Sequence, residues 1–241
     1  MQEFWRQESN YLDSKLPEVC SHTFYAPPLT DNSTVIDLGG STGAFSHALA
    51  ATFGCRCHVV EATSYNIERI QESDRVKKYH LAISGSDEPV TINLSDEGFH
   101  SGSIERLNGI NFGATEEVQG IMFESFLNKI GCLEPDLVKV DIEGAEIQMF
   151  DTTTDNIIQG VGQFTVEFHD FMDISHTDNI RRIIERLKSI GFVCFVFTRK
   201  YHGDVMFINS EKHRLSLMEE IAIRGITKYT RGMKRIARRM I

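Results

Sequence analysis

The sequence predicts an α/β fold with a doubly wound, mostly parallel sheet that ends in an antiparallel hairpin. Short β-branched segments alternate with helix-like segments along most of the chain, a pattern typical of parallel sheets covered by helices. A glycine-rich turn joins the first strand, at 34–38, to the helix at 44–53. Two strand-like segments at 192–197 and 205–209 follow one another without a helix between them, which predicts the hairpin.

The composition is that of one ordinary globular domain. The 241 residues are enough for one full core, and 41% hydrophobic and 24% charged residues fall in the usual range. The sequence has no apolar run long enough for a membrane span, and its first residues lack the basic-then-apolar pattern of a secretory signal. The five cysteines are scattered, which favours free thiols. We therefore expect a cytoplasmic protein.

The elements are expected in a regular order after a helical lead-in at 1–28, where the Pro27-Pro28 turn opens the main domain at 29–210. The segment 95–111 is rich in Gly, Ser and Asn and is expected to be a loop. Expected strands lie at 34–38, 56–60, 76–83, 90–94, 117–123, 137–140, 163–168, 192–197 and 205–209. Expected helices lie at 44–53, 65–72, 124–130, from 144 to 150 and at 180–190.

The turn after the first strand carries the strongest functional signal. Gly39 and Gly43 bracket Gly40 and Ser41, and Asp37 lies in the strand before them. Such a turn lets a nucleotide-like cofactor approach backbone N–H groups. The acid suits a cofactor with amine or hydroxyl groups better than bare phosphates, and both the dinucleotide fingerprint and the P-loop are absent. A close-packed turn without a ligand is the alternative interpretation.

A second acid ends the next strand. Glu61 lies 24 residues after Asp37, where a carboxylate can accept hydrogen bonds from both hydroxyls of a ribose. Asn66 falls in the first turn of the following helix and is expected to orient the loop. The strand end at Ala82 and Ile83 is expected beside an adenine ring, where apolar groups and the backbone suffice.

Further acids follow the strand at 137–140. Asp141 and Glu143 are two residues apart, so both can face one site at the strand end, where open α/β sheets bind ligands. Glu146 is interpreted as a helix N-terminal acid favoured by the macrodipole. Glu167 and His169 share parity at the end of the next strand. Beside Asp141 they predict either a proton-transfer centre or a three-ligand metal site.

The last 21 residues carry seven basic side chains and no acid, so the chain before them has a net charge of −16 against −9 for the whole protein. The tail at 211–241 is expected to form a basic amphipathic helix, because apolar residues recur at spacings of three and four from Ile226 to Met240. Such a helix could contact an anionic membrane at its inner surface, pack on the body or mediate self-association. No aromatic platform accompanies the charge, so nucleic acid is not an expected partner.

Taken together, these motifs resemble the FkbM family of S-adenosylmethionine-dependent methyltransferases over 34–209. The resemblance rests on Ile36-Asp37-Leu38-Gly39 with Gly43, Glu61 with Asn66, Ala82-Ile83-Ser84, Val166-Glu167-Phe168-His169, and above all Leu137-Val138-Lys139-Val140-Asp141-Ile142-Glu143-Gly144-Ala145-Glu146. The chain departs from the family at Gly40-Ser41, where Ala-Asn is usual, and at Ala62, where Pro is common.

The resemblance implies a seven-stranded, Rossmann-like class I methyltransferase sheet and S-adenosylmethionine as the cofactor. It also implies methyl transfer to a hydroxyl oxygen of a sugar, glycan or other small metabolite. The expected cofactor-binding residues are Asp37, Gly39, Gly40, Ser41, Gly43, Glu61, Ala62, Asn66, Ala82, Ile83 and Asp141, and the expected catalytic residues are His169, Asp141, Glu143 and Glu167.

The mechanistic hypothesis makes His169 the base that deprotonates the acceptor, oriented by Asp141, Glu143 or Glu167. In the alternative assignment, Asp141 contacts the amino group of the cofactor. A divalent metal is an open alternative, but no metal ligands are assigned. The rival functions are a non-catalytic cofactor- or glycan-binding protein that docks through its tail, and a nicotinamide-dependent oxidoreductase, which the missing glycine pattern disfavours.

Overall fold

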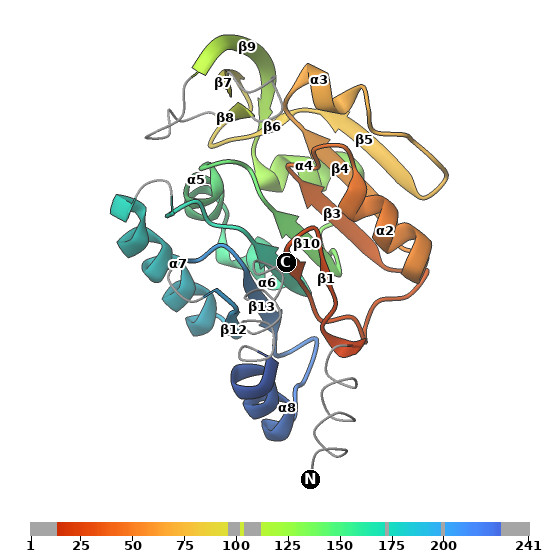
Figure 1. Ribbon diagram of the computed structural model, residues 1–241, viewed down its shortest axis with the longest axis vertical. Helices are drawn as coiled ribbons and strands as arrows, with labels where there is room; N and C mark the ends of the chain where they lie inside the picture. Colours follow the sequence, from red (N-terminus) through yellow and green to blue (C-terminus); the bar gives the residue numbers. More distant parts are fainter. Residues whose placement is uncertain (1–13, 96–101, 104–111, 172–173, 199–200, 228–241) are drawn as a thin grey trace, which may run out of the picture.

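The computed structural model describes residues 14–95, 102–103, 112–171, 174–198 and 201–227, and its centre is a seven-stranded sheet (Figure 1). The strand order across this sheet is β12-β13-β11-β10-β3-β4-β5. In chain order the strands are β3 (Thr34–Leu38), β4 (Arg56–Glu61), β5 (Val76–His80), β10 (Leu137–Val140), β11 (Gln163–Val166), β12 (Phe192–Val196) and β13 (Val205–Asn209).

The strand order places a ligand crevice at the middle of the sheet. β3 pairs in parallel with β4 on one side and with β10 on the other, so the winding reverses direction there. Only β13 runs antiparallel, since it pairs in that sense with both β11 and β12. A doubly wound sheet binds ligands outside the carboxyl ends of its strands at such a reversal. The predicted α/β fold is confirmed.

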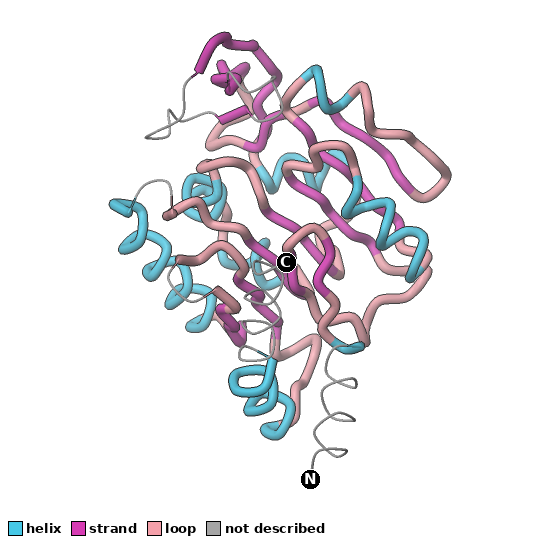
Figure 2. Tube along the Cα trace, viewed as in Figure 1, coloured by secondary structure: helices cyan, strands magenta, loops and turns pink. Residues whose placement is uncertain are grey.

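Helices cover both faces of the sheet because successive strand residues point to opposite sides (Figure 2). Val35 packs in one core with α2 (Ala44–Phe53), whereas its neighbour Ile36 packs in the other. This second and larger core also holds residues from α4 (Phe123–Ile130), α5 (Glu146–Thr152), α6 (Asp155–Gly160) and α7 (Thr177–Ser189). Sequence reasoning missed α6, whose six residues are too few for a clear helical period.

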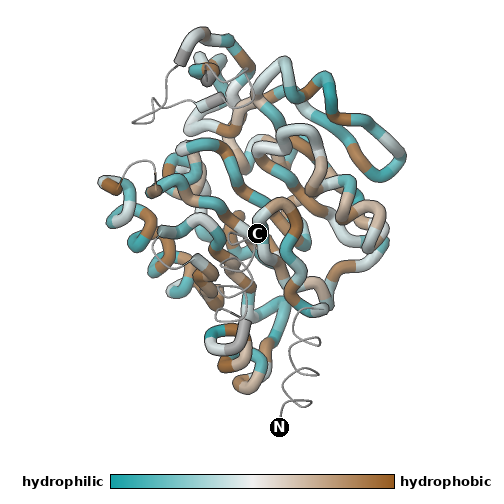
Figure 3. Tube along the Cα trace, viewed as in Figure 1, coloured by the Kyte–Doolittle hydropathy of each residue, from teal (hydrophilic) through white to brown (hydrophobic). Residues whose placement is uncertain are grey.

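Helix α7 shows how the sequence pattern produces this packing. Its buried residues are Ile180, Ile183, Ile184 and Leu187, which recur at spacings of three, one and three. Figure 3 shows hydrophobic and hydrophilic residues alternating along this helix. The apolar stripe therefore faces the sheet and the charged residues face solvent.

A smaller sheet lies beyond the carboxyl ends of the central strands, at the top of Figure 1. Its order is β6-β9-β7-β8, with β6 (Ala82–Ile83), β7 (Pro89–Ser95), β8 (Gly102–Ser103) and β9 (Phe112–Ile121). The single strand expected at 76–83 is therefore wrong, because the chain leaves the central sheet after β5 and pairs Ala82 with Gly120. The strand expected at 117–123 begins earlier, at Phe112, because it pairs along the length of β7.

The described part of the N-terminal segment begins with the helical residues Ser14 and Lys15 and then forms a small antiparallel ribbon at 18–23. β1 (Glu18–Val19) pairs with β2 (His22–Thr23) through a turn in which Cys20 and Ser21 have φ of 49° and 66°. Thr23 fastens the ribbon to the sheet, since its backbone N–H and hydroxyl both donate to Asp204. The expected lead-in at 1–13 lies outside the described residues.

Four shorter elements complete the described chain. α3 (Ser64–Ile67) is shorter than the helix expected at 65–72, because the Lys78 ammonium binds the carbonyl oxygens of Ile67 and Ile70. A 3-10 turn, η1 (Ile174–His176), precedes α7. α8 (Leu217–Ala222) continues into the π-helical turn η2 (Ile223–Thr227), and the rest of the predicted basic helix, 228–241, lies outside the described residues. In the parts of the chain that are described, no helix has the length and apolar character to cross a membrane.

Candidate active site

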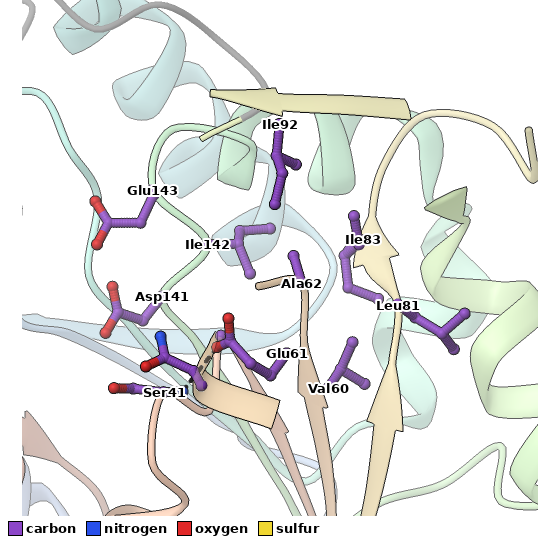
Figure 4. A pocket seen from close by; sticks show the side chains of 13 residues that line it. Ser41, Val60, Glu61, Ala62, Leu81, Ile83, Ile92, Asp141, Ile142 and Glu143 are labelled. Carbon is purple, nitrogen blue, oxygen red and sulfur yellow. Dashed lines mark hydrogen bonds between the residues drawn. The ribbon is translucent and has the colours of Figure 1, made fainter. Parts of the chain in front are cut away.

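A pocket opens at the carboxyl ends of β3, β4 and β10, where the strand order reverses (Figure 4). Its lining includes nine of the residues expected from the sequence: Gly39, Ser41, Glu61, Ala62, Asn66, Ala82, Ile83, Asp141 and Glu143. Val60, Leu81, Ile92 and Ile142 complete it. Figure 4 shows the carboxylates of Asp141 and Glu143 on one side and the apolar groups of Leu81, Ile83 and Ile92 on the other. The pocket thus has an acidic side and an apolar side.

The glycine turn needs glycines for reasons of space. Gly39 has φ of 74°, and a Cβ there would lie 1.7 Å from the carbonyl oxygen of Asp141. A Cβ on Gly40 would lie 2.0 Å from Cγ1 of Val59, and Gly43 has φ of 80°. Such backbone conformations and contacts favour glycine. The turn can therefore pack closely against β10 and β4. Gly40 and Gly43 were expected to line the pocket, but neither does.

Glu61 is already held in place by the turn that it faces. One carboxylate oxygen accepts from the backbone N–H of Ser41 at 2.8 Å, and the other accepts from the N–H and the hydroxyl of Thr63, both at 2.8 Å. Burial raises the pKa of Glu61, and these hydrogen bonds oppose that rise. The side chain is thus preorganised at the pocket, with acceptor capacity left for a ligand hydroxyl.

Asp37 does not line the pocket, contrary to expectation. It is fully buried, accepts a hydrogen bond from the Ser46 hydroxyl at 2.8 Å and lies 3.1 Å from the ammonium of Lys139. Lys139 also donates to the carbonyl oxygen of Gly39 at 2.7 Å. Burial alone would lower the pKa of Lys139, but Asp37 and Asp141 outweigh it and raise that pKa. Asp37 therefore supports the glycine turn through a buried ion pair.

At the acidic side of the pocket, Asp141 lies close to the side chains of Lys139, His22 and His169. Its Oδ2 lies 3.5 Å from the Lys139 ammonium and 3.4 Å from Nε2 of His22, and its Oδ1 lies 3.7 Å from Nε2 of His169. Burial favours the neutral acid, but Lys139, His22 and His169 outweigh it and hold the pKa of Asp141 well below its usual range. The pocket thus presents an ionised carboxylate.

His169 is buried among carboxylates. Its Nδ1 lies 3.0 Å from Glu146 and its Nε2 lies 3.3 Å from Glu143. Glu146 begins α5 as expected, but it also accepts from the backbone N–H groups of Ile142 and Gly144. Burial opposes the charge on His169, yet Glu146 and Glu143 raise its pKa to about 11. A pKa raised this far disfavours the neutral imidazole that a general base needs, so these contacts do not favour the expected base role of His169.

We expect His169 to be an imidazolium at pH 8, whereas His58 should be neutral there. Burial and Arg56 lower the pKa of His58, which makes it a matched control in the same molecule. The ring ¹⁵N chemical shifts of the two residues, assigned with His169→Gln and His58→Gln, separate the two forms. A neutral His169 ring at pH 8 would contradict this prediction and restore the base hypothesis.

Two groups of side chains have the spacing of metal ligands. His22, Asp141 and Glu167 form one, and Asp141, Glu143 and His169 form the other, with the candidate ligand atoms of each within 4.8 Å of one another. A metal ligand must offer a free electron pair, which a protonated His169 lacks. Asp141 already faces Lys139. Lys139 and His169 therefore already pair with the carboxylates of Asp141 and Glu143, and a metal ion in the second group would have to displace them.

Glu167 is a third carboxylate at the acidic side, and one of its oxygens lies within 4.8 Å of a carboxylate oxygen of Asp141. Its backbone N–H donates to Val140, which places it at the end of β11 beside β10. Burial and the charge of Asp141 raise its pKa, while His169 and His22 act in the opposite direction. A half-buried carboxylate with a raised pKa is suited to accept a proton.

Sequence reasoning missed several residues of the site, among them His22, Lys139 and Ile92. His22 lies outside every motif, and it reaches Asp141 only because the N-terminal ribbon packs on β11 and β13. Lys139 lies within the distinctive motif, and its charge in an otherwise apolar strand was a signal that it needs a buried partner. Ile92 comes from the smaller sheet, and its sequence carries no signal of a ligand contact.

Comparisons with known proteins identify the family of this chain. The model of the methyltransferase FkbM domain matches residues 37–194. Similar solved structures include precorrin-6y C5,15-methyltransferase from Geobacter metallireducens, with 13% identity, a TM-score of 0.41 and coverage of 84% of this chain and 86% of that chain. Another is an N-methyltransferase from Haemonchus contortus, with 13% identity, a TM-score of 0.36 and coverage of 79% and 38%. No curated protein sequence matches this chain.

The sheet order, the glycine turn and the strand-end acids define a methyltransferase. The chain belongs to the FkbM methyltransferase family, whose domain model covers well over half of its length.

Proposed function

We propose that this protein transfers a methyl group from S-adenosylmethionine to a hydroxyl oxygen of a sugar, glycan or other small metabolite. The observation that carries the proposal is the position of Glu61, a preorganised carboxylate at the end of β4, between the glycine turn and an apolar wall. That combination suits a ribose with its two hydroxyls next to an adenine ring.

The residues around the pocket divide naturally among the parts of this cofactor. Glu61 would accept hydrogen bonds from the ribose hydroxyls, and Leu81, Ile83 and Ile92 would contact the adenine. Asp141, held ionised, would pair with the cationic amino group of the methionine part. Ser41 lies at the turn on the same side of the pocket as Glu61, to which its backbone N–H is bonded.

Binding of S-adenosylmethionine, S-adenosylhomocysteine and NAD, measured by calorimetry, tests the proposal. The two sulfur compounds should bind and NAD should not, because no glycine fingerprint positions a pyrophosphate. Binding of NAD without either sulfur compound would overturn the proposal in favour of an oxidoreductase. The matched binding-site variant is described in the Discussion.

The cofactor, when bound, would supply the methyl carbon. The acceptor oxygen would bond to that carbon as the carbon–sulfur bond breaks, and the electron pair of the broken bond would stay on sulfur. The protein then has two tasks, which are to align the acceptor and to take up its hydroxyl proton. Glu167 is the base in our proposal, since burial and the charge of Asp141 raise its pKa and so favour uptake of a proton. His169 stays charged and holds the Glu143 side chain.

The variant Glu167→Gln should lower kcat by a factor of about 10² to 10⁴, the usual contribution of a general base. Cofactor affinity should stay unchanged, because Glu167 does not line the cofactor pocket. The wild-type rate should fall as pH drops through the raised pKa of Glu167, since the base is then protonated, and the variant should lose this acidic limb. Transfer of a labelled methyl to a panel of hydroxylated glycosides measures both effects.

The control for this variant is Glu185→Gln, an acid in α7 that pairs with Lys188 on the surface. It should retain wild-type kcat at every pH. A Glu167→Gln enzyme with normal kcat and an unchanged pH profile would remove Glu167 from the mechanism.

A further inference from the structure

One large apolar side chain is exposed next to the catalytic carboxylates. Phe171 follows β11, is 40% exposed, and its ring centroid lies 5.3 Å from that of His169. Its other aromatic neighbour is Tyr201, with ring centroids 6.4 Å apart. Most Phe side chains in the described part of this protein are buried, so Phe171 presents a rare apolar face beside the site.

The charges around Phe171 are arranged so that the negative groups face the solvent. The side chains of Asp141 and Glu143 are 27% and 29% exposed, whereas the cations Lys139 and His169 are only 5% and 4% exposed. Figure 4 shows the Asp141 and Glu143 carboxylates on the side away from the apolar wall. An entering molecule therefore meets hydrogen-bond acceptors of negative charge.

The exposed Phe171 ring and the partly exposed carboxylates both lie beside His169. The His169 imidazole contacts Glu143 through Nε2 and Phe171 through its ring. A carboxylate oxygen of Glu167 lies within 4.8 Å of Asp141, the next neighbour of the same imidazole. His169 thus joins the aromatic ring and the carboxylates into one cluster of side chains.

We propose that Phe171, Glu143 and Glu167 form an acceptor subsite that selects an uncharged, hydroxylated ring. The apolar face of such a ring would cover Phe171, while its hydroxyl groups would donate to the carboxylates. An acceptor with a carboxylate or phosphate of its own is disfavoured, because its charge would meet Glu143 and Glu167, and the described cations Lys139 and His169 are buried against carboxylates. This inference rests on the proposed function and adds to it the chemistry of the acceptor.

The test uses saturation-transfer NMR on the full chain, with and without S-adenosylhomocysteine. The probes are methyl α-glucopyranoside, its uronate analogue with a carboxylate at C6, and sorbitol, which lacks a ring. The glucoside should bind best, with the uronate and sorbitol at least about tenfold weaker. Phe171→Ala should weaken glucoside binding at least about tenfold, and Phe171→Trp should retain it. Glu143→Gln should reduce the difference in affinity between the glucoside and the uronate.

Leu217→Ala, which truncates an apolar side chain that is 73% exposed on α8, is the control and should change nothing. Glucoside binding that is unaffected by Phe171→Ala, equal binding of the uronate, or no probe binding at tens of millimolar would each overturn the subsite. Calorimetry with S-adenosylhomocysteine separates the two proposals. If the wild type did not bind S-adenosylhomocysteine, the proposed function would be overturned. The probe experiment without cofactor would still show whether the subsite binds the glucoside.

Discussion

Replacing Lys139 by Met is expected to lower the free energy of unfolding by about 3–5 kcal/mol, the usual effect of removing one partner from a buried ion pair. Asp37 is fully buried, and without Lys139 it loses its charged partner while it keeps the hydrogen bond from Ser46. The carbonyl oxygen of Gly39 loses its donor at the same time. Urea denaturation of the variant and the wild type measures the difference.

The control for Lys139→Met is Lys188→Met, which breaks an exposed pair with Glu185 and should cost less than about 1 kcal/mol. The double variant Lys139→Met with Asp37→Asn should recover part of the loss, because the uncompensated charge is then gone. Equal costs for the buried and the exposed lysine would mean that the glycine turn does not depend on this ion pair.

Replacing Glu61 by Ala is expected to weaken S-adenosylhomocysteine binding by about 100-fold, or 2.7 kcal/mol, because hydrogen bonds to a charged group are among the strong ones. The effect has two sources in the structure. The ribose hydroxyls lose their acceptor, and the backbone N–H groups of Ser41 and Thr63 lose the carboxylate that fixes the turn. Calorimetric titration of the variant measures the loss.

Glu68→Ala removes an exposed acid just beyond α3 and should bind with wild-type affinity. The melting temperature of each variant shows whether the fold is intact. If Glu61→Ala bound S-adenosylhomocysteine within about threefold of the wild type, which is well under 1 kcal/mol, Glu61 would have only a structural role.

The parts of the fold that were predicted correctly depend on local patterns. The core strand β3, the helix α2 and the amphipathic α7 follow from side-chain periodicity and flanking glycines. The wrong or missed elements depend on distant partners. The strand expected at 76–83 divides because Ala82 and Ile83 pair with β9, some 40 residues later. The N-terminal segment becomes a ribbon because Asp204 and Gln163 bind it.

The same division holds within the site. Glu61 and Asp141 end parallel strands, so the sequence could place both at the pocket. Asp37 belongs to the same motif, yet it turns into the core toward Lys139. The raised pKa of His169 depends on two carboxylates, Glu143 at a φ of 53° and Glu146, which the backbone N–H groups of Ile142 and Gly144 hold. No local pattern encodes these contacts with His169.

The sequence by itself determined the sheet, the position of the glycine turn and the strand-end acids, because each depends on neighbours a few residues away. The tertiary structure alone decided that His22 reaches Asp141 across 119 residues, that Lys139 is buried between two acids, and that Glu143 and Glu146 raise the pKa of His169. Burial and the distance between charges set a pKa, and both exist only once distant segments have packed together.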